Sequence, residues 1–256
     1  MKKLFKMQNS PIIVCVIAIV LMVAVLIFLI SMFSSASANL GKQQQWTSGK
    51  DSFDRAYEIA ALDKDTPDKT LYVPNLCEQI GKTVDQACQN IGQGATVVST
   101  SSSTNDYNSG AISETHISLN NESGNEKSGT PNIIAYTNRS GRIVKISFSC
   151  NVWLLGYGNY SYIDMVNNFH IIEKTLNEAG LNVDEGSVKT PENRELYTTY
   201  DSDGTTTIMQ NWTFSGSSLK NGKTYSWSSN LVFDYSIANS KGDLSETIRT
   251  ITIGIQ

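Results

Sequence analysis

Cysteine is the most reactive residue type in this chain of 256 residues, and there are four of them. Cys15 lies within an apolar run, whereas Cys77, Cys88 and Cys150 lie beyond it. Three cysteines allow one disulfide and one remaining thiol. The apolar periodicity around Cys88 and Cys150 turns both side chains toward a core, which makes an activated thiolate improbable. We therefore expect a bridge among the three cysteines, with Cys88–Cys150 the favoured pair.

Two histidines, His116 and His170, are the candidates for general acid–base chemistry. Serine-hydrolase, zinc-protease and phosphate-loop motifs are all absent, and no CxxC pair suggests a zinc site. Residues 201–204 read DSDG, like the start of a calcium loop, but the later acidic ligands are missing, so a hairpin turn is expected. We predict no catalytic site, no metal site and no cofactor.

Aromatic residues cluster between two predicted elements, at Trp153, Tyr157, Tyr160 and Tyr162. Loops that join regular elements often carry binding residues. The cluster is thus a candidate surface for a carbohydrate or a peptide, although the same side chains would also suit a core.

The N-terminal part of the chain predicts a membrane segment. Residues 11–33 contain no charge, and as a helix they would extend about 34 Å, enough to cross a bilayer. Lys2, Lys3 and Lys6 precede the run, so the positive-inside bias orients the rest of the chain outward. The alternative is a signal peptide cleaved after Ala38, because residues 36–38 read ASA.

These features divide the chain and restrict its partners. After the three N-terminal lysines are set aside, 17 basic and 24 acidic residues remain, a net charge of −7. Binding to nucleic acid needs clustered basic residues, so we exclude it and expect a cell-envelope protein or a peptidoglycan component as partner. The predicted parts are a cytoplasmic region (1–10), a transmembrane signal-anchor (11–33), a flexible stalk (34–50) and an extracytoplasmic domain (51–256).

Helical periodicity is clearest in three places. Residues 51–64 predict a short amphipathic helix. Residues 83–92 predict a helix that begins with a Thr83/Gln86 capping box. Residues 161–179 predict the main helix, capped by Ser161 and ended by Gly180, which leads into a strand.

Strand alternation covers most of the remainder. Residues 97–100, 111–119, 132–137, 144–154, 225–237 and 251–255 read as strands, and Asn221-Gly222 is a strong hairpin signal. An antiparallel sheet with one polar face and one face covered by two or three helices explains this alternation. The predicted fold class is α+β.

The segment VPNLCEQIGKTVDQACQNIG, residues 73–92, carries the local resemblances. It resembles the start of a PASTA module, a muropeptide- and β-lactam-binding unit whose second half is missing here, through these positions: Val73, Pro74, Asn75, Leu76, Gly81, Ala87 and Ile91. The same segment is similar to helix-plus-meander modules of the BamE-like and β-lactamase-inhibitor-like kinds, through the following positions: Gly81, Lys82, Thr83, Ala87, Ile91 and Gly92.

As a whole the chain resembles uncharacterised anchored or secreted proteins of Gram-positive, actinobacterial-type bacteria, through phrases such as LGYG and TLNEAGL. The resemblance implies a location rather than an activity. We expect a membrane-anchored binding protein without catalysis. The alternatives are an enzyme inhibitor, an envelope hydrolase, or a structural component that associates through its edge strands.

Overall fold

The computed structural model describes residues 67–102, 110–119 and 130–256, all of which belong to one compact unit, Lys50–Gln256. The predicted membrane segment, the stalk, the helix at 51–64, Cys15 and the cleavage position at Ala38 lie outside the described residues. Among the helices that the structure does describe, none has the length and apolarity needed to cross a membrane.

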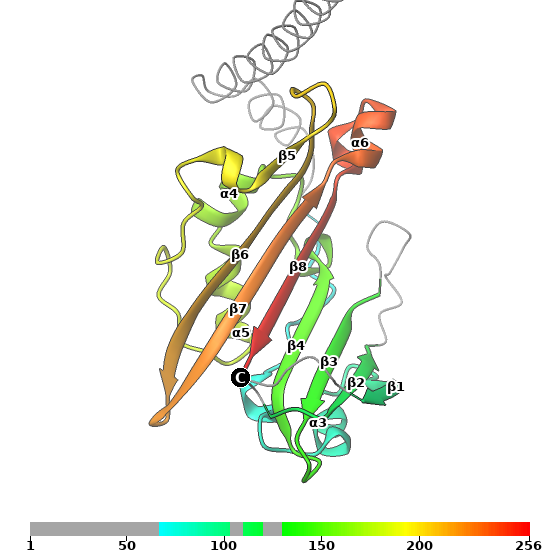
Figure 1. Ribbon diagram of the computed structural model, residues 1–256, viewed down its shortest axis with the longest axis vertical. Helices are drawn as coiled ribbons and strands as arrows, with labels where there is room; N and C mark the ends of the chain where they lie inside the picture. Colours follow the sequence, from blue (N-terminus) through cyan, green and yellow to red (C-terminus); the bar gives the residue numbers. More distant parts are fainter. Residues whose placement is uncertain (1–66, 103–109, 120–129) are drawn as a thin grey trace, which may run out of the picture. The chain divides into compact units, whose positions relative to one another are not determined.

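The described residues form an eight-stranded antiparallel sheet with few helices, so strands dominate the fold (Figure 1). The strand order is β1-β2-β3-β4-β8-β7-β6-β5. The strands are β1 (Thr96–Ser102), β2 (Ser113–Ser118), β3 (Asn132–Thr137), β4 (Ile143–Asn151), β5 (Thr198–Tyr200), β6 (Thr207–Lys220), β7 (Lys223–Asp234) and β8 (Ile248–Ile255).

Two four-stranded meanders make up the sheet, and β8 joins them. Strands β1 to β4 pair in chain order, as do β5 to β8. The last strand then pairs with β4, with Phe148 opposite Ile253. Helical segments precede each meander, so a helix followed by four antiparallel strands occurs twice along the chain.

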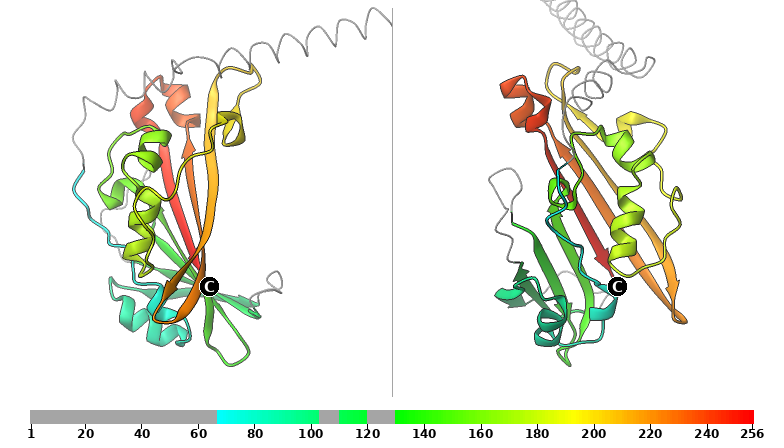
Figure 2. Two further views of the ribbon diagram at one scale, coloured as in Figure 1. Left: turned by 90° about the vertical axis from the view of Figure 1, so that its left-hand side faces the viewer. Right: turned by 180° about the vertical axis from the view of Figure 1, so that it is seen from behind.

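The helices cover one face of the sheet, which we call the inner face, and the opposite face is the outer face (Figure 2). Side chains of α3, α4 and α5 join the strands' apolar side chains in a single core. The α-helices are α3 (Val84–Ile91), α4 (Tyr162–Asn167), α5 (Ile171–Glu178) and α6 (Ser236–Lys241), and the 3₁₀ turns are η1 (Cys77–Gln79), η2 (Val152–Leu155), η3 (Arg194–Leu196) and η4 (Leu244–Glu246).

Alternation along the central strands explains why the core lies on the inner face. Successive side chains of a strand point to opposite faces, so one set of alternate residues is buried together. On β4 the buried set includes Ile146, Phe148 and Cys150, and on β8 it includes Ile251 and Ile253. The predicted antiparallel sheet with helices on one side is therefore confirmed.

Helix α3 confirms the predicted capping box. Thr83 Oγ1 accepts from Gln86 N at 3.3 Å, and Gln86 Oε1 accepts from Thr83 N at 3.1 Å. These bonds satisfy two backbone donors that the first turn of a helix leaves free. Ala87 and Ile91 are the buried residues of α3, so this part of the capped segment is explained by packing alone.

The predicted long helix at 161–179 is wrong in one respect, because it is broken into α4 and α5. His170 lies between the two helices with φ +53°, in the left-handed region. A left-handed residue cannot continue a right-handed helix, so the hydrogen bonds restart: Phe169 N donates to Asp164 O, and Lys174 N donates to His170 O. Apolar residues recur at helical spacing on both sides of the break, which hid it from the sequence pattern.

Two predicted strands end earlier than expected. The strand predicted to Leu154 stops at Asn151, whose side-chain Oδ1 accepts from Trp153 N at 2.9 Å and starts η2. The strand predicted to Ile237 stops at Asp234, whose carboxylate accepts from Ser236 N and leads into α6. In both cases a side-chain oxygen binds a nearby backbone N–H and competes with the strand ladder.

The strand predicted after Gly180 is also wrong. Asn182 is attached to β6 through a side chain: its N–H donates to Ser218 Oγ at 3.1 Å, and that hydroxyl donates to Asn182 O at 2.7 Å. The hydroxyl of Ser218 therefore bonds to both backbone groups of Asn182, in place of the backbone hydrogen bonds of a further strand. The hairpin turn predicted at DSDG is confirmed, with Asp201 N donating to Thr206 O and Gly204 N donating to Asp201 O.

Candidate functional site

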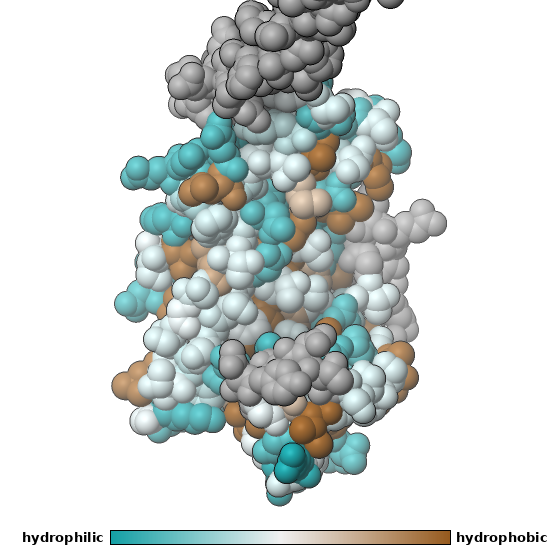
Figure 3. All heavy atoms as spheres, in the orientation of Figure 1, coloured by the Kyte–Doolittle hydropathy of each residue, from teal (hydrophilic) through white to brown (hydrophobic). Residues whose placement is uncertain are grey.

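The outer face of the sheet carries mainly polar side chains along β6, β7 and β8. The strand registers align its side chains in rows, one of which runs through Ile134, Ser147, Gly254, Ser228 and Ser215. On β6, β7 and β8 none of the outward positions from 211 to 217, 226 to 232 and 250 to 254 is ionisable. Figure 3 views this face, and pale, weakly polar side chains predominate along these strands.

In the part of the outer face nearer α6, the polar side chains form hydrogen bonds with one another. Asn230 Nδ2 donates to Asn211 Oδ1 and to Thr213 Oγ1, both at 2.8 Å. Ser149 Oγ and Thr252 Oγ1 lie 2.9 Å apart and share a further bond. These side chains satisfy one another across four neighbouring strands, so few polar groups remain here for a ligand.

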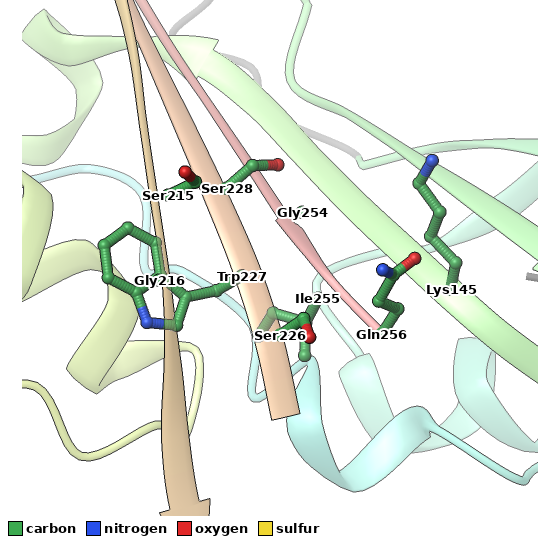
Figure 4. A pocket seen from close by; sticks show the side chains of 9 residues that line it. All are labelled: Lys145, Ser215, Gly216, Ser226, Trp227, Ser228, Gly254, Ile255 and Gln256. Carbon is green, nitrogen blue, oxygen red and sulfur yellow. The ribbon is translucent and has the colours of Figure 1, made fainter. Parts of the chain in front are cut away.

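The part nearer the β6–β7 hairpin is hollowed and has free hydroxyls. A hollow of about 430 Å³, which we call the Gly254 hollow, lies over β6, β7 and β8, beside Lys145 of β4. Among the described residues, the hydroxyls of Ser147, Ser215, Ser226 and Ser228 make no hydrogen bond. Figure 4 shows the residues that line the hollow, which are Lys145, Ser215, Gly216, Ser226, Trp227, Ser228, Gly254, Ile255 and Gln256.

Two glycines shape the sheet at this hollow. A Cβ on Gly254 would lie 3.2 Å from Ser228 Oγ and 3.9 Å from Ser147 Cβ. Because glycine has no side chain, the backbone of β8 forms the bottom of the hollow at this position. On the inner side, a Cβ on Gly216 would lie 2.5 Å from the indole of Trp227. The indole therefore packs flat on the backbone behind the hollow and stiffens it.

The charged groups of the outer face lie beside this hydroxyl region. Lys145 Nζ lies 5.0 Å from the centroid of the Tyr136 ring. On the neighbouring strand, His116 Nε2 and Glu114 Oε1 lie 2.7 Å apart. His116 thus lies against a carboxylate on the strand surface, and it does not line the hollow.

The aromatic cluster predicted as a binding surface is divided by the fold. Tyr162 is fully buried, and its hydroxyl donates to Leu231 O at 3.3 Å. Burial, followed by the nearby carboxylates of Glu178, Glu185 and Glu173, raises the pKa of Tyr157 to about 12. Tyr160 packs on Phe169 with ring centroids 3.9 Å apart, and only Trp153, 40% exposed, has a large accessible surface.

The predicted Cys88–Cys150 disulfide is not formed, because Cys77, Cys88 and Cys150 are all free. Cys88 belongs to α3, which begins beside the start of β4, because Ile143 N donates to Lys82 O just before the helix. Cys150 lies seven residues farther along β4, about 23 Å from Ile143. A bridge needs Cα atoms within about 7 Å. Two inward-facing cysteines need not be neighbours in an elongated core. Burial raises the pKa of all three thiols, most strongly for Cys150.

His170 lies beside a buried carboxylate. Glu173 is fully buried, and its Oε1 accepts from Gly186 N and from Val188 N, each at 3.0 Å. His170 Nδ1 lies 3.9 Å from the same oxygen, and neither Nδ1 nor Glu173 Oε2 has a hydrogen-bond partner. The carboxylate holds the turn at 184–188 against α5, which is a structural role.

The described residues contain no group of three or more histidine, cysteine, aspartate or glutamate side chains arranged to hold a metal ion. The sequence pattern did not reveal the hydroxyl-lined hollow. The available signal was the run of alternate, uncharged outward positions in TFSGS (213–217) and SWSSN (226–230). No protein-family model, curated protein or solved structure matches the chain.

Proposed function

We propose that this chain is a membrane-anchored, extracytoplasmic binding protein of the bacterial cell envelope and that it does no chemistry. Its N-terminal apolar run, preceded by lysines, supports the anchor and the outward orientation. The binding surface is the outer face of the sheet.

One observation carries the assignment to the outer face. The helices leave this face uncovered, and its hydroxyls around the Gly254 hollow have no partner among the described residues, whereas the adjoining part of the same face is internally bonded. Polar groups that are fixed on a rigid sheet and still free to bond are suited to hold a ligand.

The location is tested by fractionating cells that express the full chain. The protein should stay with membranes until detergent is added, and its mass should include residues 1–38. External protease should digest the domain in intact cells after the wall is opened. A soluble chain that begins after residue 38 would instead support the cleaved form.

The binding role is tested with the full chain in detergent, mixed with solubilised envelope. The chain should retain an envelope component, and a Gly254→Val variant that fills the hollow should lose it. A Ser99→Ala variant on the far edge of the same face serves as the control. Equal retention by all three proteins would contradict the outer-face assignment.

An enzyme is the second candidate, and one observation favours it: two unpartnered polar atoms of His170 and Glu173 lie close together beneath the surface. Turnover of a hydrolase substrate panel by the full chain, abolished by His170→Ala, would support this candidate. An enzyme inhibitor would be expected to present a concave aromatic surface on the sheet. Strands β2, β3, β4, β6, β7 and β8 place a single aromatic residue, Tyr136, on the outer face, so an inhibitor is less favoured.

A further inference from the structure

We propose that the Gly254 hollow binds a neutral saccharide, held by the hydroxyls of Ser215, Ser226 and Ser228, which line it, and by that of Ser147, whose Cβ would lie 3.9 Å from a Cβ on Gly254. The inference deepens the binding role proposed above and rests on it. It follows from three properties of the hollow: the chemistry of its free groups, its lack of ionisable side chains along β6–β8, and its size.

The free groups are hydroxyls, and a hydroxyl can both donate and accept a hydrogen bond. A sugar ring presents the same kind of group on several sides, so each serine can adopt the role that its partner needs. Neighbouring strands are about 4.8 Å apart, which is comparable with the distance between hydroxyls on opposite sides of a pyranose ring. Ser215 and Ser228, on the neighbouring strands β6 and β7, are therefore spaced to meet two hydroxyls of one ring, and Ser147 lies two strands from Ser228, where a second ring would reach it.

Charge argues against the other polar ligands. Phosphate, carboxylate and nucleic acid are held by paired or clustered cations. The outward positions of β6, β7 and β8 around the hollow have no ionisable group, and Lys145 at its rim already lies against Tyr136. An anionic ligand would therefore meet a single cationic side chain here, that of Lys145.

Size and depth set the class of saccharide and its affinity. A volume of about 430 Å³ is toward the lower end of ligand sites and suits one or two sugar rings. No aromatic ring faces the ligand, because Trp227 packs on the inner side of Gly216. Binding therefore rests on hydrogen bonds and is weak, with an expected Kd of roughly 0.1–1 mM.

The test uses the full chain in lauryldimethylamine oxide, a detergent without a sugar headgroup. Saturation-transfer NMR and calorimetry measure binding of chitotriose, maltotriose, trigalacturonate and triserine. Chitotriose and maltotriose separate an N-acetylated from a plain neutral sugar, trigalacturonate tests charge, and triserine tests a peptide. At least one neutral trisaccharide should bind, and more tightly than trigalacturonate or triserine.

The variants assign the binding to the hollow. The double variant Ser215→Ala, Ser228→Ala removes two hydroxyls from exposed positions and should weaken binding at least about fivefold without affecting folding. Gly254→Val fills the floor and should abolish binding. Ser99→Ala makes the same change on the same face, about 24 Å away across the strands, and should bind as the unaltered chain does.

Several results would overturn the inference: no neutral trisaccharide binds, the anionic sugar or the peptide binds best, or the hollow variants bind normally. If no saccharide binds but Gly254→Val still loses an envelope component, the saccharide inference fails and the binding function stands. If that component is also unaffected, both fail.

Discussion

The side chains on the two faces of the sheet differ in their interactions with the rest of the protein. On the inner face, apolar residues such as Phe148 and Ile253 are buried against three helices. On the outer face, most alternate residues of the central strands are serine, threonine and asparagine, and some of their hydroxyls make no hydrogen bond with the described residues. The same backbone therefore carries a surface that stabilises the fold and a surface that we propose binds a ligand.

The comparison shows how these demands are separated. Because side chains alternate along a strand, Phe148 can supply packing while the hydroxyl of its neighbour Ser147 makes no hydrogen bond with the described residues. Changes on the outer face should alter binding with little effect on folding, and changes on the inner face should do the reverse. The following predictions test this separation.

The largest effect is expected for Phe148→Ala. Removing a fully buried ring from the inner face should lower the free energy of unfolding by about 3–5 kcal/mol, because it loses apolar burial and leaves a cavity. Ser147→Ala, one residue away on the outer face, should change it by less than about 0.5 kcal/mol. Urea unfolding measures both, and similar losses would contradict the difference between the faces.

Cysteine reactivity provides a second comparison. Burial, and then the nearby Glu178 carboxylate, raises the pKa of Cys150, so its thiolate is scarce at pH 8. Cys88 is partly exposed, and iodoacetamide should modify it at least about a hundredfold faster. Raising the pH to 9 should speed modification of Cys88 while Cys150 stays protected. Peptide mass spectrometry follows each site, and equal rates would show that the core opens readily.

A buried polar contact should give a smaller loss. Glu173→Ala leaves Gly186 N–H and Val188 N–H without their acceptor and should lower the free energy of unfolding by about 2 kcal/mol. Glu173→Gln keeps an oxygen that can accept both bonds and should cost less. If the two variants are equally destabilised, the charge rather than the two accepted bonds is what matters.

The smallest stability change is expected within the outer face itself. Asn230→Ala removes two cross-strand bonds and should lower the free energy of unfolding by about 0.5–1 kcal/mol. Ser228→Ala, whose hydroxyl has no described partner, should leave it unchanged. Thermal unfolding at matched protein concentration resolves the pair. A destabilised Ser228→Ala would mean that this hydroxyl is structurally engaged.

Much of the fold could be read from local patterns. Alternation predicted β4, β7 and β8 and the buried face of each, and the Thr83/Gln86 capping box located the start of α3. These features depend on neighbours within a few residues, which the sequence contains. The interruption at His170 and the early ends of β4 and β7 were missed, because the deciding contacts are particular hydrogen bonds that helical or strand periodicity does not encode.

The candidate site depended more strongly on long-range structure. The sequence by itself determined that serines and threonines alternate with apolar residues along the strands, and so that one face would be polar. Only the tertiary structure decided that β8 lies between β4 and β7, which brings Ser147, Gly254 and Ser228 into one row. It also decided that Tyr162 enters the core and that Cys88 and Cys150 stay apart. Strand order and distances across a core arise from contacts between residues far apart in sequence, and local periodicity does not specify them.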